Sequence, residues 1–429
     1  MSGKTILFWP ESAYGPTNNC IGIGNVLKNR GHNVVFAAES SWGGRLEPLG
    51  FKEALVDLAP PPENADAQSA GQFWKDFIRD TAPEFRKPTV EQLETFITPT
   101  RQALIDGAIY CEPRLKEIIA QHKPDVIIED NVVCFPATVT AGVPFVRIVS
   151  CNPLEIMGEK IAPPFSGLAE SDPDSWKSYL QAYEKTQRPM WEKFNNWVIS
   201  QGAKALPDLD FIHTSKDLNM YVYPQELDYT DKRPLASNWH RIDSSVRSTD
   251  KPFELPAEVT NRPSDSKLIY LSLGSLGSAD VDLMKRLIGI LGKTRHKFIV
   301  SKGPQASEFE LASNMVGAEF LPQISIIPKV DLVITHGGNN TTTESVHFGK
   351  PMIVLPLFWD QYDNAQRVHE KGHGIRLATY HFKDEELTNA IEKLTTDTAL
   401  LAKLSKIGEQ VRSRKGIEEA ATKIEALAK

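Results

Sequence analysis

Short apolar runs alternate with longer amphipathic segments along most of this chain of 429 residues. Apolar runs of about four to eight residues predict buried strands, and helical periodicity predicts the segments between them. The first run, residues 5–9, precedes a loop, a helix expected over about 20–30 and a second strand over 33–37. Because strands that alternate with helices favour a parallel sheet, this βαβ unit indicates an α/β protein. Further strands are expected at residues 125–129, 145–149, 220–222, 268–273, 296–300, 318–321, 332–335, 352–355 and 374–377.

One stretch interrupts the alternation. Residues 228–265 are rich in Asp, Ser, Pro and Arg and have few periodic apolar positions. Such a composition is typical of a linker. A chain of this length is also long enough for two α/β domains. We therefore predict a first domain over residues 1–227, a linker over 228–265 and a second domain over 266–400, followed by a charged amphipathic helix over 401–429.

Composition excludes several classes of protein. The 48 basic and 55 acidic residues give a net charge of −7, which argues against binding to nucleic acid or to anionic membranes. The four cysteines show neither CxxC pairing nor metal-ligand spacing, which fits a reducing cytosol. Proline, arginine and threonine break the most apolar long stretch, residues 132–151, so it predicts buried strands rather than a membrane span. We expect a cytoplasmic protein without stable membrane insertion and without a metal site.

Residues 335–364, THGGNNTTTESVHFGKPMIVLPLFWDQYDN, are the most informative part of the sequence. An apolar strand runs into His336, two glycines and two asparagines, and a helical segment follows. Glycines at a strand-to-helix turn let backbone N–H groups approach an anion, and the helix N-terminus adds about half a positive charge. Glu344 lies about two helical turns further on and is placed to accept from sugar or ribose hydroxyls. With the acid-amide pair Asp360 and Gln361, the segment predicts a site for a nucleotide diphosphate sugar.

This pattern resembles the donor-binding motif of the UDP-dependent glycosyltransferases, especially the bacterial soluble branch that acts on macrolides and flavonoids. The match runs from His336 through Glu344, Pro351 and Pro356 to Asn364, and residues 320–323 resemble the motif's entry. The resemblance implies two Rossmann-like domains that face each other across a cleft, the GT-B arrangement. It also implies that the C-terminal helix, residues 401–429, packs back on the first domain. The implied partners are a UDP-sugar and a small lipophilic or phenolic acceptor.

The resemblance also implies roles for individual residues. Phe320 would stack on uracil beside Gln323, and Glu344 would accept from the ribose. Asp360 and Gln361 would bind hydroxyl groups of the sugar, and Trp359 would shape that side of the site. The residues expected to hold the diphosphate are Gly274, Ser275, His336, Gly338, Asn339, Asn340 and Thr341.

Two segments of the second half have a simpler explanation as well. Residues 273–278 read LGSLGS. Within them, Gly274 to Ser278 can form a loop that binds the diphosphate, or an ordinary βα turn with an N-capping serine. Asp280-Val281-Asp282 fits the DxD pattern of metal-dependent glycosyltransferases. Because it stands at a predicted helix start, we interpret it as a helix cap.

The general base is the element that the sequence does not supply in the usual form. The resemblance implies a histidine in the loop after the first strand, at the position of Pro16, and an aspartate that orients it, at Asp130. None of the ten histidines lies in this loop. Asp130 could be the base itself, Glu11 could replace the histidine, or the acceptor could arrive already acidic, as a phenol does. Asp130 could also be a structural carboxylate that caps the next helix.

The aromatic residues between Asp172 and Gly202 recur at helical spacing. They predict either a pair of helices that wall an acceptor pocket or an ordinary packing face. The resemblance implies an inverting hexosyltransferase that moves a hexose from UDP-sugar to a hydroxyl without a cofactor. Asp360-Gln361 resembles the pair of glucose users, so glucose is the expected hexose. The alternative is a sugar-nucleotide-binding protein of the same fold with impaired catalysis. The sequence does not define the oligomeric state.

Overall fold

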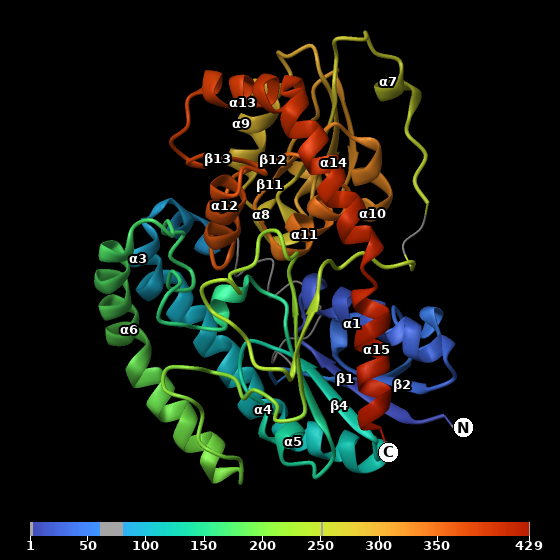
Figure 1. Ribbon diagram of the computed structural model, residues 1–429, viewed down its shortest axis with the longest axis vertical. Coiled ribbons are helices and arrows are strands. Elements are labelled where there is room, and N and C mark those ends of the chain that lie inside the picture. The colour runs from blue at the N-terminus through green and yellow to red at the C-terminus, as the bar shows by residue number, and fades with distance from the viewer. Residues whose placement is uncertain (1–2, 61–79, 250–251, 429) are drawn as a thin grey trace.

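The first domain is built on a parallel sheet of seven strands. A computed structural model describes residues 3–60, 80–249 and 252–428, and it shows two domains, the first below the second in Figure 1. The strand order is β3-β2-β1-β4-β5-β6-β7. The strands are β1 (Thr5–Pro10), β2 (Asn33–Glu39), β3 (Lys52–Val56), β4 (Val126–Asp130), β5 (Phe145–Val149), β6 (Leu218–Val222) and β7 (Trp239–Ile242). All side chains of the central strands β4, β5 and β6 are buried, as expected for a sheet covered on both faces, whereas the edge strands β3 and β7 are partly exposed.

The helices of the first domain cover both faces of this sheet. They are α1 (Tyr14–Asn29), α3 (Thr89–Gln92), α4 (Thr98–His122), α5 (Pro136–Val139) and α6 (Pro173–Ser200). Helix α1 starts six residues earlier than the predicted start at residue 20. The sequence pattern places Pro16 in the loop. The structure places it in the first turn of the helix, where the missing N–H of proline breaks no intrahelical hydrogen bond. The loop after β1 is therefore short, residues 11–13.

The second domain repeats the plan with six parallel strands in the order β10-β9-β8-β11-β12-β13. These are β8 (Leu268–Ser272), β9 (Lys297–Ser301), β10 (Met315–Ala318), β11 (Leu332–Thr335), β12 (Met352–Val354) and β13 (Gly374–Arg376). Its helices are α8 (Gly274–Gly277), α9 (Val281–Leu291), α10 (Gln323–Ile326), α11 (Asn339–His347), α12 (Gln361–Glu370), α13 (Asp384–Thr396) and α14 (Thr398–Ser413). The predicted pair of Rossmann-like domains is confirmed.

Two predicted segments differ in the structure. Within the stretch 228–265, residues 239–242 form β7, an edge strand of the first sheet that pairs with β6. Only two of its four residues are fully buried, so it lacks a long apolar run. The same stretch also holds the short helix α7 (Ala257–Thr260). In the second domain, the strand expected at 318–321 lies at 315–318. Phe320 does not belong to the core but is 51% exposed.

The C-terminal segment returns to the first domain later than residue 401. Helix α14 packs against α11 and α13 of the second domain, whereas α15 (Gly416–Leu427) packs against α1. Figure 1 shows α15 beside α1 and the first sheet. Between the two helices, Arg414 forms ion pairs with Glu226 at 2.6 Å and Asp243 at 3.0 Å. Leu404 and Val411 are buried, so the apolar face of α14 belongs to the second domain.

The aromatic segment forms one helix of 28 residues, α6, rather than two. Tyr179, Tyr183 and Phe194 point into the hydrophobic cores. The helix lies on the outer side of the first domain (Figure 1), away from the sheet edge where the cavity described below is found. The packing interpretation is therefore the right one.

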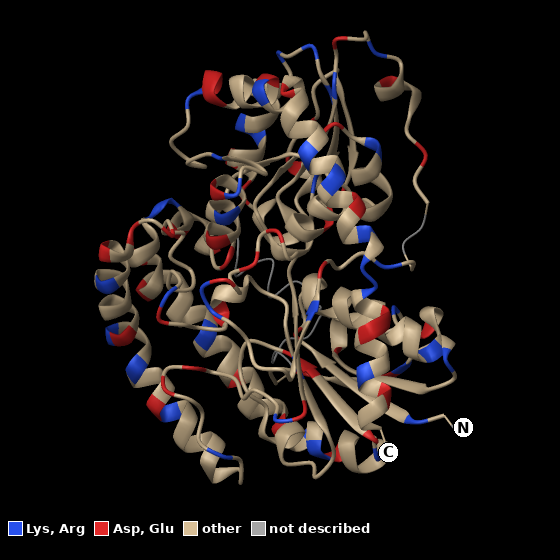
Figure 2. Ribbon diagram, viewed as in Figure 1, with Lys and Arg blue, Asp and Glu red and all other residues tan. Residues whose placement is uncertain are grey.

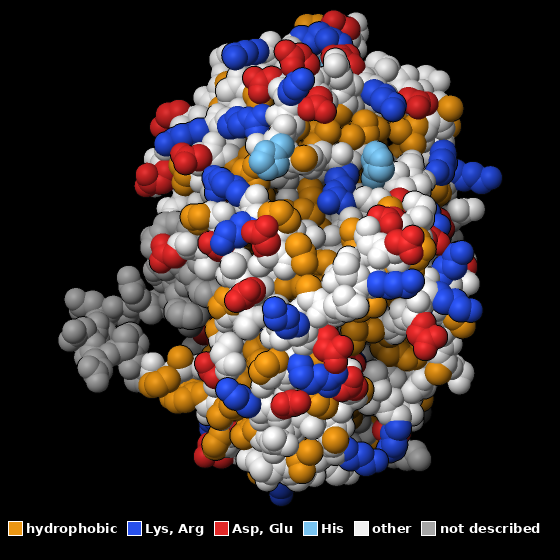
Figure 3. All heavy atoms as spheres, turned by 90° about the vertical axis from the view of Figure 1, so that its left-hand side faces the viewer, with side chains coloured by type: hydrophobic (Ala, Val, Ile, Leu, Met, Phe, Trp, Pro, Cys, Tyr) orange, Lys and Arg blue, Asp and Glu red, His pale blue; other side chains and the backbone are white. Residues whose placement is uncertain are grey.

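The surface carries charges of both signs. Figure 2 shows Lys and Arg interspersed with Asp and Glu on the outer helices of both domains. The face seen in Figure 3 is mixed in the same way, with apolar side chains between the charges. Among the described residues, no helix is both long and apolar enough to cross a membrane.

Candidate active site

A cavity of about 510 Å³ lies between the two domains. Its walls come from the carboxyl ends of strands in both sheets, which is where ligands bind in open α/β sheets. The first domain contributes the segment 11–16, the ends of β2, β4 and β5, and part of α4. The second domain contributes residues after β8, β10, β11 and β12. The volume is in the range of sites for small organic ligands.

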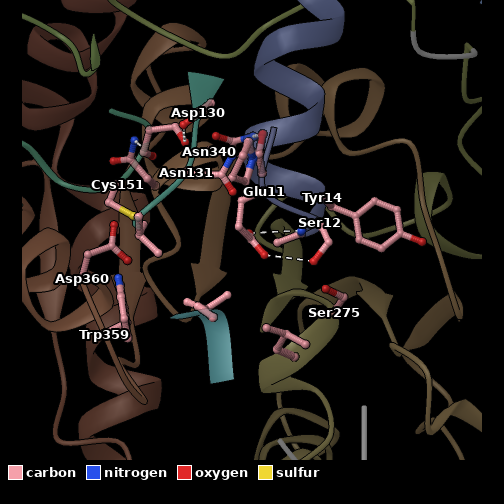
Figure 4. A pocket seen from close by; sticks show the side chains of 18 of the residues that line it. Glu11, Ser12, Tyr14, Asp130, Asn131, Cys151, Ser275, Asn340, Trp359 and Asp360 are labelled. Carbon is pink, nitrogen blue, oxygen red and sulfur yellow. Dashed lines mark hydrogen bonds between the residues drawn. The ribbon is translucent and has the colours of Figure 1, made fainter. Parts of the chain in front are cut away.

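Two predicted catalytic carboxylates, Asp130 and Glu11, line the same cavity. Asp130 ends β4, and the neighbouring strand β1 leads to Glu11, whose N–H donates to the Asp130 carbonyl oxygen at 2.8 Å. Ser150 donates to Asp130 Oδ1 at 2.8 Å, and Oδ2 has no hydrogen-bond partner among the described residues. Both oxygens of Glu11 already accept, Oε1 from the Ser12 hydroxyl and Oε2 from the Ala13 N–H. Figure 4 shows Glu11 turned toward Ser12, with Asp130 above it.

Burial controls the protonation of these two acids. It raises the pKa of Asp130 to about 7, against the opposing effects of the Ser150 hydrogen bond and Arg147. Burial also raises the pKa of Glu11, and hydrogen bonds from Ala13 and Ser12 oppose it. A carboxylate with a pKa near neutrality and an unpaired oxygen fits the requirements of a general base. Of the two acids, Asp130 has both properties. Pro16, which occupies the position where the resemblance implied a histidine, lines the same cavity.

The turn before α11 is the expected diphosphate site. Gly337 has a φ of +89°, and Gly338 is the N-cap residue of α11. The amides of residues 339–341 therefore start the helix, where backbone N–H groups lack acceptors within the helix. The His336 ring lies between two glycines, because a Cβ on Gly274 would be 2.7 Å from its Nε2 and a Cβ on Gly338 would be 2.6 Å away. Burial lowers the pKa of His336 to about 4, so the ring is neutral.

The two asparagines of the motif also join the domains. Asn339 donates from its side-chain amide to the carbonyl oxygens of Ser150 and Val222, both at 2.8 Å. Asn340 donates to the Gly15 carbonyl oxygen at 3.2 Å. Both asparagines line the cavity. The donor motif thus holds the first domain in place over the cavity.

The residues expected to bind ribose lie together. Gln323 donates to Glu344 at 2.5 Å and to Thr341 Oγ1 at 3.0 Å. The interdomain segment also contacts Glu344, because the Ser245 hydroxyl donates to it at 3.0 Å and Arg247 lies 3.8 Å away. Glu344 is 2% exposed. The carboxylate is therefore held by the second domain and by the interdomain segment.

At the opposite side of the cavity, Trp359, Asp360 and Cys151 lie close together (Figure 4). Asp360 accepts from the Asn152 N–H at 2.8 Å and from the Asn364 amide at 3.3 Å. The Gln361 amide oxygen instead accepts from the N–H groups of Leu357 and Phe358, at 3.1 and 3.3 Å. Asp360 thus faces the cavity, while Gln361 closes the turn behind it.

Eight of the predicted site residues line the cavity and seven lie behind its lining. Those in the lining are Glu11, Asp130, Ser275, Phe320, Asn339, Asn340, Trp359 and Asp360. Those behind it are Gly274, Gln323, His336, Gly338, Thr341, Glu344 and Gln361. The sequence interpretation missed several polar lining residues, above all Glu155, Glu39 and Asn131. Each follows or ends a strand of the first sheet, so the rule that sites form at this edge could have found them.

The remaining interpretations concern the start of α9. Asp280 is its N-cap residue and accepts from the Leu283 N–H at 3.1 Å. Its other oxygen accepts from the Tyr380 hydroxyl at 2.8 Å and lies 3.3 Å from Arg86. This confirms the helix cap. Residues 274–277 form the short helix α8, and Ser278 donates to the Gly274 carbonyl oxygen at 2.7 Å rather than capping the helix.

Replacing Phe320 tests whether its ring stacks on the base of the nucleotide. Its ring is half exposed at the cavity rim and lies 5.9 Å from the Tyr14 ring. Stacking of a base on an aromatic ring is worth about 1–3 kcal/mol. We therefore expect Phe320→Ala to weaken UDP binding by about 5- to 150-fold in isothermal titration calorimetry. Phe320→Trp should bind UDP more tightly than the wild type, and UDP binding by Phe320→Ala with wild-type affinity would contradict the stacking role.

Comparison with known proteins identifies the family of this chain. The family model described as UDP-glucoronosyl and UDP-glucosyl transferase matches residues 185–414, more than half of the chain. The protein therefore belongs to this family and is a glycosyltransferase. The predicted family and enzyme class are confirmed, and the alternative of impaired catalysis finds no support among the relatives.

Several curated relatives match nearly the whole chain. NDP-glycosyltransferase YjiC of Bacillus subtilis (strain 168) is 23% identical over 97% of this chain and 95% of its own length. Oleandomycin glycosyltransferase of Streptomyces antibioticus is 24% identical over 98% of this chain and 90% of its own length. Among solved structures, the glycotransferase of kitacinnamycin superposes with a TM-score of 0.72 at 18% identity and covers all of both chains. This similarity confirms the GT-B fold.

Proposed function

We propose that the protein transfers a hexose, glucose, from UDP-glucose to a hydroxyl group of a lipophilic or aromatic natural product, with inversion at the anomeric carbon. The observation that carries the proposal is the position of Asp130, a buried carboxylate with an unpaired oxygen in a cavity shared with the donor motif. The aromatic and aliphatic lining suits an apolar acceptor, and it includes Trp42, Phe96, Leu104 and Ile212.

The reaction needs one displacement. Asp130 removes the proton of the acceptor hydroxyl as its oxygen forms a bond to the anomeric carbon. The bond between that carbon and the diphosphate oxygen breaks, and UDP leaves with the bonding electrons. Backbone amides at the start of α11 and the Ser275 segment offset the charge on the departing diphosphate. No step requires a metal ion or a cofactor, and Asp280 of the DxD pattern is held by Leu283, Tyr380 and Arg86.

The direct test is an assay of transfer with a panel of acceptors. Purified protein is incubated with UDP-glucose and with phenols, flavonoids or macrolides, and mass spectrometry detects products that are one hexose heavier. TDP-glucose is run in parallel to compare the nucleotides. We expect transfer to at least one acceptor and preference for UDP. Tight UDP binding without transfer to any acceptor would overturn the proposal in favour of a sugar-nucleotide-binding protein.

A further inference from the structure

The polar groups on the sugar side of the cavity come from both domains. Gln361 uses its amide oxygen within its own turn and stands outside the lining. Asp360 stands in the lining, but Oδ2 is already bound by Asn152 and Asn364. The second domain thus presents the Oδ1 atom of Asp360 at this wall. Glu155 of the first domain supplies a further carboxyl group at the same place.

Glu155 lies in the short turn that follows β5, residues Pro153–Glu155. Its Oε1 accepts from the Trp359 indole N–H at 3.1 Å across the interface between the domains. Among the residues that the structure describes, Oε2 accepts no hydrogen bond. The side chain is half-buried and lines the cavity. One oxygen is therefore fixed by protein and the other is available to a ligand.

The partner of Glu155 is held in a strained conformation. Trp359 has a φ of +54°, a left-handed backbone that is rare for a bulky residue. Its ring packs 4.8 Å from the Phe165 ring, and the Arg101 guanidinium lies 5.6 Å from its centre. Such strain persists only where the surroundings fix it, and it gathers at ligand sites. The contacts hold Trp359, and through its indole N–H they hold Glu155 beside Asp360.

The electrostatics of this wall favour hydroxyl groups. Burial raises the pKa of Glu155 to about 7, and nearby Asp360 raises it further while Arg101 opposes the shift. Burial also raises the pKa of Asp360 to about 6. Two desolvated carboxyl groups that lie close together gain from neutral hydroxyl donors, which restore the hydrogen bonds lost with water. A hexose offers several such hydroxyls.

We propose that Glu155 is a specificity-determining residue that binds hydroxyl groups of the transferred sugar together with Asp360, from the opposite domain. This role rests on the proposed hexosyl transfer. A site built to bind a hydroxyl rejects a sugar that lacks it, because a buried polar group is then left unpaired. Glu155 therefore controls the choice between donor sugars and leaves the binding of the nucleotide unaffected.

The test compares UDP-glucose, UDP-galactose and UDP-xylose in the wild type, Glu155→Gln and Glu155→Ala. We expect Glu155→Ala to lower kcat/KM for UDP-glucose at least tenfold and to reduce the glucose-to-xylose ratio at least fivefold. The dissociation constant of UDP alone should change less than twofold. Glu155→Gln keeps an acceptor for Trp359 and should fall between the two. Glu170→Gln is the matched control, because Glu170 also joins the domains, through Arg367, but lies outside the cavity lining.

Each outcome has one meaning. A glucose-to-xylose ratio in Glu155→Ala equal to that of the wild type would overturn the role of Glu155 alone. Equal losses in UDP binding and in transfer from all three donors would also overturn it, because they indicate a structural defect. If the wild type transfers no sugar from any of the three donors, the proposed function fails, and the role of Glu155 fails with it.

Discussion

Replacing Asp130 with alanine is expected to lower kcat for glycosyl transfer by at least 100-fold while UDP affinity stays within twofold of the wild type. The loss follows because general base catalysis contributes about 10²- to 10⁴-fold. The affinity is retained because the residues predicted to hold UDP lie in the second domain, whereas Asp130 ends β4 of the first. Steady-state kinetics and calorimetry with UDP measure the two quantities. Full activity in Asp130→Ala would dismiss Asp130 both as a base and as a positioning residue.

The pH profile gives a second readout of the same group. A base must be deprotonated, so kcat/KM with a neutral aliphatic alcohol should rise tenfold per pH unit below the pKa of Asp130 and level off above it. Because burial raises that pKa to about 7, the bend is expected near pH 7. An acidic phenol should show a weaker dependence on Asp130, since it can bind already ionised. A bend that persists in Asp130→Asn would assign the base to Glu11.

The free energy of unfolding shows whether an Asp130 variant loses activity through the chemical step or through misfolding. The folded pKa of Asp130 lies above the unfolded value, so the folded state binds more protons between about pH 4 and 7. Stability from this group therefore falls as pH rises through that window. Asp130→Asn removes the buried charge and should not lower the free energy of unfolding at pH 8. A variant that is inactive and at least as stable as the wild type would locate the loss in the chemical step.

The burial of side chains explains which parts of the fold could be predicted from the sequence. Strands such as β4 and β11 are continuous apolar runs because both faces of a parallel sheet are covered, and their positions followed from the sequence. Strand β7 was missed because His240 and Arg241 break the apolar run at the edge of the sheet. The strand near 318 was misplaced because Phe320 is apolar but serves the cavity rim rather than the core. The hydrophobic pattern predicts which side chains are buried, and it fails where an apolar side chain stands at the rim of a cavity.

The candidate site also has a part that the sequence predicted and a part that it did not. The donor motif is continuous in sequence, so its residues were found together. The first-domain wall is assembled from separate strand ends, and Glu155 belongs to a turn that shows no motif of its own. Its significance comes from the hydrogen bond with Trp359 and from the nearby charge of Asp360, two residues that stand more than 200 positions further along the chain. Only the fold brings them together.

His336 is the second residue whose replacement is expected to have a large effect. Its neutral ring fills the space between Gly274 and Gly338 and so sets the distance between the two turns that are predicted to hold the diphosphate. We expect His336→Ala to lower kcat/KM for UDP-glucose by about 100-fold, because a small misplacement of the groups that position a substrate can cost a rate factor of this order. If the ring acts through its N–H dipole, His336→Gln should recover about tenfold of this loss, because an amide donates without charge.

A matched control for this prediction lies on the following helix. Burial also lowers the pKa of His347 to about 4, but this ring contacts Ser244 and does not lie between Gly274 and Gly338. His347→Ala should therefore change kcat/KM less than threefold although it also removes a largely buried imidazole. Equal losses in His336→Ala and His347→Ala would mean that packing explains the effect. A loss confined to His336, with partial recovery in His336→Gln, assigns the ring to the diphosphate.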